Sequence, residues 1–174
     1  MKKQLLHAAA VLFAAVLLCS AGTAEGYINA NDLEAGTLTE TERYEDGFVV
    51  SARADKTVVV DTAADGRTAP DGEVFTQRIK LGGTGTAEYR SILFPVQAGE
   101  TVTIYLNSSS AADARMLVFA NAAGDVVATI TAPADVKGEL KSGMESVAVP
   151  AAGDYMVYSK SGGINIYQIT VTAK

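Results

Sequence analysis

The chain has 174 residues, of which 48% are hydrophobic and 20% are charged, and its formal net charge at pH 7 is −6. This length is enough for one compact domain with two packed layers. The acidic balance argues against nucleic acid or an anionic membrane as a partner, because both require a basic surface.

The first 24 residues have the pattern of a secretory signal peptide. Two lysines at positions 2 and 3 precede an apolar run over residues 5–18, and small residues follow it. We expect cleavage after Ala24, which predicts a secreted, extracellular protein with no membrane contact after cleavage. The alternative is a lipid anchor at Cys19, but two bulky leucines directly before this cysteine disfavour that processing.

Cleavage at this position leaves a single predicted domain, residues 25–174, with neither cysteine nor histidine, because Cys19 and His7 are removed. A hydrophobic core must then hold the domain without disulfides. Histidine general bases, thiol nucleophiles and Cys/His metal sites are excluded as well. Two of the fourteen basic residues are lost and all twenty acidic ones stay, so the net charge moves to about −8.

Short β-branched or aromatic runs recur along the chain at intervals of about eight to twelve residues, with Gly, Asp, Asn, Ser or Pro between them. This spacing is typical of a sandwich or barrel, and we predict an all-β, two-sheet antiparallel β-sandwich that is jelly-roll-like. Loops are expected at 62–72 and at 133–142, the second with one weak helical turn as an alternative. The predicted strands cover residues 47–53, 56–61, 74–81, 88–96, 101–107, 115–120, 125–130, 144–149, 154–159 and 164–172.

The predicted strand 74–81 shows a clear alternation of side chains. Since successive side chains point to opposite faces of a strand, Arg78 and Lys80 are expected to point together toward water. The odd-numbered residues are expected to share the core face: Phe75, Gln77, Ile79 and Leu81.

A glycine-rich segment follows this strand, with Gly82, Gly83 and Gly85 in close succession. The lysine and the helix of a phosphate-binding loop are missing, so we do not expect nucleotide binding. The segment instead predicts a turn at the end of a sheet, where the backbone needs positive φ or a close approach to a partner. Such a turn is also a suitable rim for a ligand groove.

Aspartates near the second predicted strand suggest one metal site. Asp61, Asp65 and Asp71 offer the hard oxygen ligands that calcium prefers, although the spacing of an EF-hand is absent. Turn formation explains the Asp-Gly pairs equally well. We therefore expect no cofactor, with a structural calcium as the alternative.

Other carboxylates offer pairs for glycoside hydrolysis, but solvated turn and loop positions account for them as well. These residues are Glu40, Glu42, Glu45, Asp46, Glu88, Glu100, Glu139 and Glu145. Nothing in the sequence selects one pair among them.

Three segments carry a resemblance to a known family: FTQRIKLGGTGTAEYRSILFPV (75–96), TVTIYLNSSSAADARMLVF (101–119) and AGDYMVYSKSGGINIYQITV (152–171). Together with the opening INANDLEAGTLTE, they resemble the non-catalytic β-sandwich modules attached to secreted bacterial pectate lyases. The likeness spans nearly the whole of residues 25–174. It implies a carbohydrate-binding protein whose ligand is a plant cell-wall polysaccharide, pectin or polygalacturonate.

The resemblance also implies a set of ligand-binding residues. Each sugar of polygalacturonate carries a carboxylate, to which Arg or Lys can make charge-assisted hydrogen bonds. Apart from the resemblance, tyrosines such as Tyr105 can stack on sugar faces, with packing within a strand as the alternative. The residues in the family's motifs are Arg78, Lys80, Arg90 and Ser91, with Lys160 and Asn165 in the closing motif.

Three functions are open at this point. The first is a carbohydrate-binding module without enzymatic activity, with a separate secreted polysaccharide lyase as a further partner; it predicts a contiguous basic or aromatic groove. The second is a structural or adhesin-like interaction domain, which predicts scattered basic residues and an exposed apolar patch or an open edge strand. The third is a small carboxylate-dependent glycosidase or lyase, which requires two acids converging in a cleft, or an acid beside a basic residue and a bound cation. The resemblance favours the first.

Overall fold

A computed structural model of the chain describes residues 25–173. The predicted signal peptide and the alternative anchor at Cys19 lie outside these residues. No helix between residues 25 and 173 combines the length and apolar character needed to span a membrane. The helical segments described are two short 3-10 turns, η1 (Ala30–Asp32) and η2 (Glu45–Gly47).

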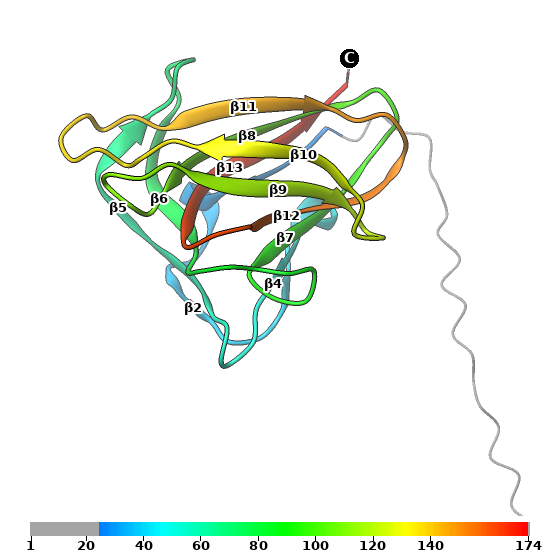
Figure 1. Cartoon of the computed structure of the whole chain (residues 1–174), viewed down its shortest axis with the longest axis horizontal. Coiled ribbons are helices and arrows are strands. Elements are labelled where there is room, and N and C mark those ends of the chain that lie inside the picture. The colour runs from blue at the N-terminus through cyan, green and yellow to red at the C-terminus, as the bar shows by residue number, and fades with distance from the viewer. Residues whose placement is uncertain (1–24, 174) are drawn as a thin grey trace, which may run out of the picture.

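Two antiparallel sheets make up the described part of the chain (Figure 1). Sheet A has seven strands in the order β11 (Gly143–Ala148), β8 (Thr101–Ser108), β13 (Ile164–Thr172), β6 (Val74–Leu81), β5 (Val58–Thr68) and β2 (Gly36–Leu38), with β1 (Gly26–Asn29) also paired to β13. Sheet B has six strands in the order β10 (Val126–Ala132), β9 (Arg115–Asn121), β12 (Gly153–Ser159), β7 (Ser91–Val96), β4 (Val49–Ser51) and β3 (Glu42–Arg43).

The core lies between the two sheets and follows the alternation of their strands. Ile79 and Leu81 of sheet A and Ile92 and Phe94 of sheet B are fully buried in one hydrophobic cluster. Residues between them in sequence, such as Lys80, point to the outer face. The predicted all-β, two-sheet sandwich is confirmed.

The ten predicted strands all appear, and two of them, 74–81 and 164–172, agree with β6 and β13 at both ends. The prediction misses β1, β2 and β3, which have only two to four residues each and no run of β-branched residues. These strands are formed by pairing with longer strands rather than by local propensity.

The predicted loop 62–72 is wrong in its first half, because β5 continues to Thr68. Asp65 and Gly66, which we expected in a loop, both have positive φ and lie within a register shift of the β5–β6 pair. They form a bulge, which leaves only 69–73 as the connection between these strands. The loop at 133–142 is confirmed, without a helical turn.

The expected position of Phe75 on the core face is also wrong. The Oδ1 atom of Asn31 accepts hydrogen bonds from the backbone N–H groups of both Thr76 and Gln77, at 2.8 and 3.0 Å. Two successive N–H groups directed to one acceptor interrupt the alternation of β6. Phe75 therefore packs with Tyr105 and Tyr167, in a second cluster separate from the core.

Three crossovers between the sheets meet at one end of sheet A. Residues 82–90 connect β6 to β7, residues 109–114 connect β8 to β9, and residues 160–163 connect β12 to β13. Backbone hydrogen bonds tie them together, from Gly85 to Ser159 and from Ser109 to Gly163. This end of the sheet carries the candidate site.

Candidate functional site

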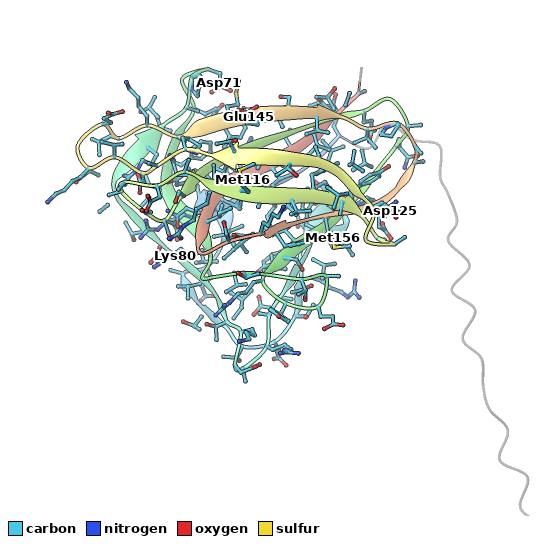
Figure 2. The ribbon with its side chains drawn as sticks, in the orientation of Figure 1. Asp71, Lys80, Met116, Asp125, Glu145 and Met156 are labelled. Carbon is cyan, nitrogen blue, oxygen red and sulfur yellow. The ribbon has the colours of Figure 1, made fainter. Side chains whose placement is uncertain are left out.

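A groove of about 660 Å³ opens on the outer face of sheet A, beside the three crossovers. Part of its floor is a row across three strands, in which Val59 of β5 pairs with Lys80 of β6, and Lys80 pairs with Asn165 of β13. Arg78, two residues before Lys80, lines the groove from the same face of β6. The predicted outward direction of Arg78 and Lys80 is confirmed, and Figure 2 shows Lys80 near this end of β6, away from Asp71 at the tip of the β5–β6 hairpin.

A second row of small residues continues the floor toward the crossovers. It consists of Thr57, Gly82, Gly163 and Ser109. Gly82 and Gly163 directly follow and precede the Leu81–Ile164 pair, so they lie at the ends of neighbouring strands. The missing side chain of Gly163 makes room for Ser109, because a β-carbon there would lie 2.6 Å from its Oγ atom, whereas a β-carbon at Gly82 would lie 4.0 Å from Nη2 of Arg90.

Arg78 and Lys80 share one counter-ion. The Nε atom of Arg78 lies 2.7 Å from Oδ1 of Asp61, and Nζ of Lys80 lies 3.1 Å from Oδ2 of the same carboxylate. Burial by itself would raise the pKa of Asp61, but the two hydrogen bonds outweigh it and the pKa is lowered. Asp61 is therefore ionised at neutral pH and offsets part of the charge on Arg78 and Lys80.

Arg90 reaches the groove from the end of the first crossover. Its Nε donates to the backbone oxygen of Thr57 at 3.3 Å. Its guanidinium group lies so close to Gly83 that a β-carbon there would be 2.6 Å from Nη1. The expected close approach at the glycine-rich segment is thus made by an arginine of the same chain. Arg90 has φ of +52°, a conformation that is unfavourable for any residue except glycine.

Arg115 enters from the start of β9, on the other side of the glycine row. Its Nη1 donates to the backbone oxygen of Gly163 at 2.7 Å and to Oγ of Ser109 at 2.8 Å. A β-carbon at Gly162 would lie 2.6 Å from its Cζ atom. Both arginines are therefore held by neutral acceptors and seated against glycines.

The groove is strongly basic in an acidic protein. Within residues 25–173, neither Arg90 nor Arg115 has a carboxylate oxygen within 4.0 Å. Four cationic side chains line the groove, and the nearest carboxylate is that of Asp61. A local positive charge of this kind attracts an anionic ligand, even though the chain as a whole is negative.

Asn165 is an unsatisfied polar residue in the floor of the groove. This residue is only 1% exposed, and neither its amide nitrogen nor its amide oxygen makes a hydrogen bond of normal geometry among the described residues. The buried hydroxyl of Tyr167, which also lacks such a bond, lies beside this amide. Buried polar atoms are nearly always paired, so the amide under the groove floor has hydrogen-bonding capacity that the described contacts do not use.

The structure brings four of the seven predicted site residues into this groove, namely Arg78, Lys80, Arg90 and Asn165. The other three lie elsewhere. Ser91 is buried and donates to the backbone oxygen of Ala87, and Lys160 is exposed in the third crossover.

Tyr105 lies outside the groove, in a buried aromatic cluster. Its ring packs at 5.2 Å from Phe75, and its hydroxyl donates to Asp71 at 2.6 Å. No aromatic residue of the described chain lines the groove. The groove therefore offers charged and hydrogen-bonding groups rather than an aromatic platform.

Sequence reasoning missed Arg115, and with it Thr57, Ser109 and Gly163. Arg115 lies in the second of the segments that carry the family resemblance, but nothing local distinguishes it from other cations. Its place at the start of a strand, after a run of three serines, is the only signal the sequence offers.

The three aspartates considered as calcium ligands do not converge. Asp61 is held by Arg78 and Lys80, and Asp71 by Tyr105. No group of three His, Cys, Asp or Glu residues suited to a metal ion occurs between residues 25 and 173. These three residues therefore do not form the calcium site that was considered as an alternative.

No family model and no curated protein sequence matches the chain. Solved structures do match in shape. The cleaved adhesin domain of Lys-gingipain from Porphyromonas gingivalis is 12% identical with a TM-score of 0.50, covering 86% of this chain and 98% of that one. A family 35 carbohydrate binding module from Clostridium thermocellum is 13% identical with a TM-score of 0.48 over 86% and 98%.

A third similar structure is CsCBM6-3 from Clostridium stercorarium, solved in complex with cellobiose. It is 13% identical with a TM-score of 0.45, covering 89% of this chain and 100% of that chain. At these identities the likeness concerns the fold alone. The function of this chain has to be argued from its own groove.

Proposed function

We propose that this protein is a non-catalytic carbohydrate-binding module whose groove binds an acidic polysaccharide of the pectin type, polygalacturonate. One observation carries the proposal: four cationic side chains from three separate parts of the chain line one groove in an otherwise acidic protein. Guanidinium and ammonium groups on rigid strands suit the carboxylates of a polyuronate. Secretion and cooperation with a separate polysaccharide lyase belong to the same proposal.

The geometry is less suited to the two other functions considered. A glycosidase requires converging acids, and no carboxylate is among the groove-lining residues within the described chain. An interaction domain predicts scattered cations, whereas Arg78, Lys80, Arg90 and Arg115 share one groove.

One observation nevertheless supports an interaction domain as the second candidate. The strand β10 lies at the edge of sheet B, and its side chains Val126 and Val127 are exposed. An edge strand with exposed apolar side chains can pair with another protein chain.

Calorimetric titration with polygalacturonate, a neutral glucan and xylan, at low and moderate salt, tests the proposal. We expect binding to polygalacturonate alone, and weaker binding at moderate salt because added ions screen the charges. Lys80→Ala should lower the affinity about threefold to fivefold, as for one partly compensated charge. The matched control is Arg43→Ala, which removes an exposed cation of sheet B outside the groove and should change nothing. Absence of binding to every glycan would support the interaction domain instead.

A further inference from the structure

We propose that Arg90 and Arg115 form an anion clamp that binds the carboxylate of one sugar, while Asn165 binds a hydroxyl of the same sugar. The proposal rests on the proposed function and deepens it, because it assigns the two chemical groups of a uronate to separate residues. It also gives Arg115 a role that the family resemblance does not.

The two guanidinium groups lie at neighbouring strand ends. Gly82 and Gly163 flank the Leu81–Ile164 pair, and adjacent strands of a sheet lie about 5 Å apart. Arg90 is seated on the β6 side of this row, against Gly83, and Arg115 on the β13 side, against Gly163. A single carboxylate above the row can therefore reach both arginines.

Both arginines keep donors for a ligand. A guanidinium has five N–H groups, and the contacts described above use only Nε of Arg90 and Nη1 of Arg115. Because the acceptors are backbone or hydroxyl oxygens, these contacts orient the groups without neutralising them. A carboxylate bound here meets two fixed positive charges, so little ordering is needed on binding.

Arg78 and Lys80 differ from the clamp in this respect. Asp61 contacts both of them and compensates part of their charge. A ligand carboxylate would have to compete with Asp61 for these two side chains. The uncompensated half of the groove is therefore the stronger anion site.

The backbone of Arg90 allows a clean test. A left-handed conformation is unfavourable for arginine and easily adopted by glycine. Arg90 shares it with Asp46, Asp65 and Leu140, which do not line the groove. The guanidinium of Arg90 is thus positioned at a cost to the backbone, and Arg90→Gly removes the charge while relieving the strain.

Asn165 completes the site beside Lys80 in the row across β5, β6 and β13. Its buried amide has a donor and an acceptor that make no hydrogen bond of normal geometry, and a sugar hydroxyl can pair with them when the side chain turns toward the groove. Asn165→Ala removes two unpaired buried atoms, so the folded state should be at least as stable as before. Any loss of affinity in this variant then reports on the ligand rather than on the fold.

The test is calorimetric titration of the full chain and its variants with polygalacturonate, together with thermal unfolding of each protein. We expect Arg115→Ala and Arg90→Gly each to weaken binding at least about tenfold, as for a lost charge-assisted hydrogen bond, and Asn165→Ala about threefold to tenfold. Arg90→Gly should unfold at the same temperature as the original protein or higher.

Gly83→Ala moves the clamp without changing any charge. The added β-carbon displaces Nη1 of Arg90, and Gly83 does not have the positive φ that would make alanine strained. We expect about a fivefold loss of affinity. The matched control is Gly36→Ala, where an added β-carbon has no neighbour within 4 Å. Equal affinity of the two alanine variants would count against the clamp.

Two further outcomes separate the clamp from the proposed function. If polygalacturonate binds and Lys80→Ala weakens it more than Arg115→Ala does, the clamp is wrong and the proposed function stands. If the original protein binds no polygalacturonate, both fail, unless it binds dextran sulfate with the same dependence on Arg90 and Arg115. In that case the clamp is supported and its anion is a sulfate ester.

Discussion

The outer face of sheet A is divided into two regions that share β5, β6, β8 and β13 but differ in what lies above them. In the covered region, Phe75, Tyr105 and Tyr167 pack against two alanines. Ala63 lies in the bulge of β5, and Ala69 directly follows this strand. The loop 133–142 lies against β5 there, through hydrogen bonds between Thr68 and Leu140 and between Ser142 and Thr68. In the open region lies the groove that is lined by Arg78, Lys80, Arg90 and Arg115.

The cations of the covered and the open region differ in the groups that pair with them. Arg67 in the covered region makes two hydrogen bonds to the carboxylate of Asp135, at 2.7 and 2.9 Å, and both side chains are largely buried. Arg90 and Arg115 in the open region have only neutral acceptors. A buried cation requires a carboxylate, whereas an exposed groove allows cations to stay uncompensated. The Arg67–Asp135 pair is thus largely buried, whereas Asp61, which pairs with Arg78 and Lys80 in the open region, remains partly exposed.

The largest effect that would sharpen this comparison is expected for Phe75→Ala in the covered region. Phe75 is fully buried, and its ring is stacked at 5.4 Å from Tyr167. We expect a loss of about 3 to 5 kcal/mol in the free energy of unfolding. Urea unfolding measures this loss, and titration of the folded variant should give unchanged affinity for polygalacturonate. A loss of affinity in a protein that is still folded would show that the two regions are coupled.

A smaller effect is expected for Asp61→Asn, which changes the pairing of cations in the open region. Loss of the carboxylate leaves Arg78 and Lys80 without their counter-ion, so we expect polygalacturonate to bind about fivefold more tightly, close to 1 kcal/mol. Weaker binding would mean that Asp61 serves to position the two cations.

The same variant has an expected dependence on pH. Because the pKa of Asp61 is below its ordinary value of 3.8, its carboxylate stabilises the fold at pH values above about 3.8. This contribution is lost as the pH falls through the lowered pKa. Acid unfolding of the original protein should therefore be steeper below pH of about 4 than that of Asp61→Asn.

The smallest effect is expected for Tyr105→Phe, at the border of the covered region. Removing one hydrogen bond to the exposed Asp71 should cost about 0.5 to 1 kcal/mol. Burial, followed by the hydrogen bond to Asp71, raises the pKa of Tyr105 to about 12. The folded state therefore holds its phenolic proton at pH values where the unfolded chain has lost it, and stability falls as the pH rises from about 10 to 12.

Urea unfolding between pH 9 and 11.5 measures this fall in stability. Tyr105→Phe should flatten the fall without abolishing it, since the pKa values of Tyr44 and Tyr167 are raised as well. An unchanged slope would show that Tyr105 ionises equally in the folded and unfolded states.

Sequence patterns predicted the parts of this site that depend on local alternation. Arg78 and Lys80 share a face because they are two residues apart in a regular strand, and that can be read directly. Phe75 could not be placed in this way, because the irregularity at Thr76 is created by the side chain of Asn31, 45 residues earlier.

Other parts of the site depend on long-range pairing, which one sequence does not reveal. In the sequence, Asp61 fits the role of a calcium ligand as well as that of a counter-ion. The register of β5 and β6 pairs it with Arg78 and so decides for the counter-ion. Arg90 and Asn165 were found through a family resemblance alone. Arg115 meets them only because the crossovers 82–90, 109–114 and 160–163 come together at one end of sheet A.

The position of β13 has a consequence for how the molecule folds. This last strand lies inside sheet A, between β8 on one side and β6 and β1 on the other, and it pairs Gly26 with Val171 across almost the whole described chain (Figure 1). Contacts between residues so distant in sequence are slow to form, and proteins rich in them fold in milliseconds to seconds. Gly163 and Asn165 enter the groove with this strand. A chain in which β13 has not yet paired therefore lacks both the centre of sheet A and part of the floor of the groove. Binding of the proposed ligand is thus expected only after this last strand has joined the sheet.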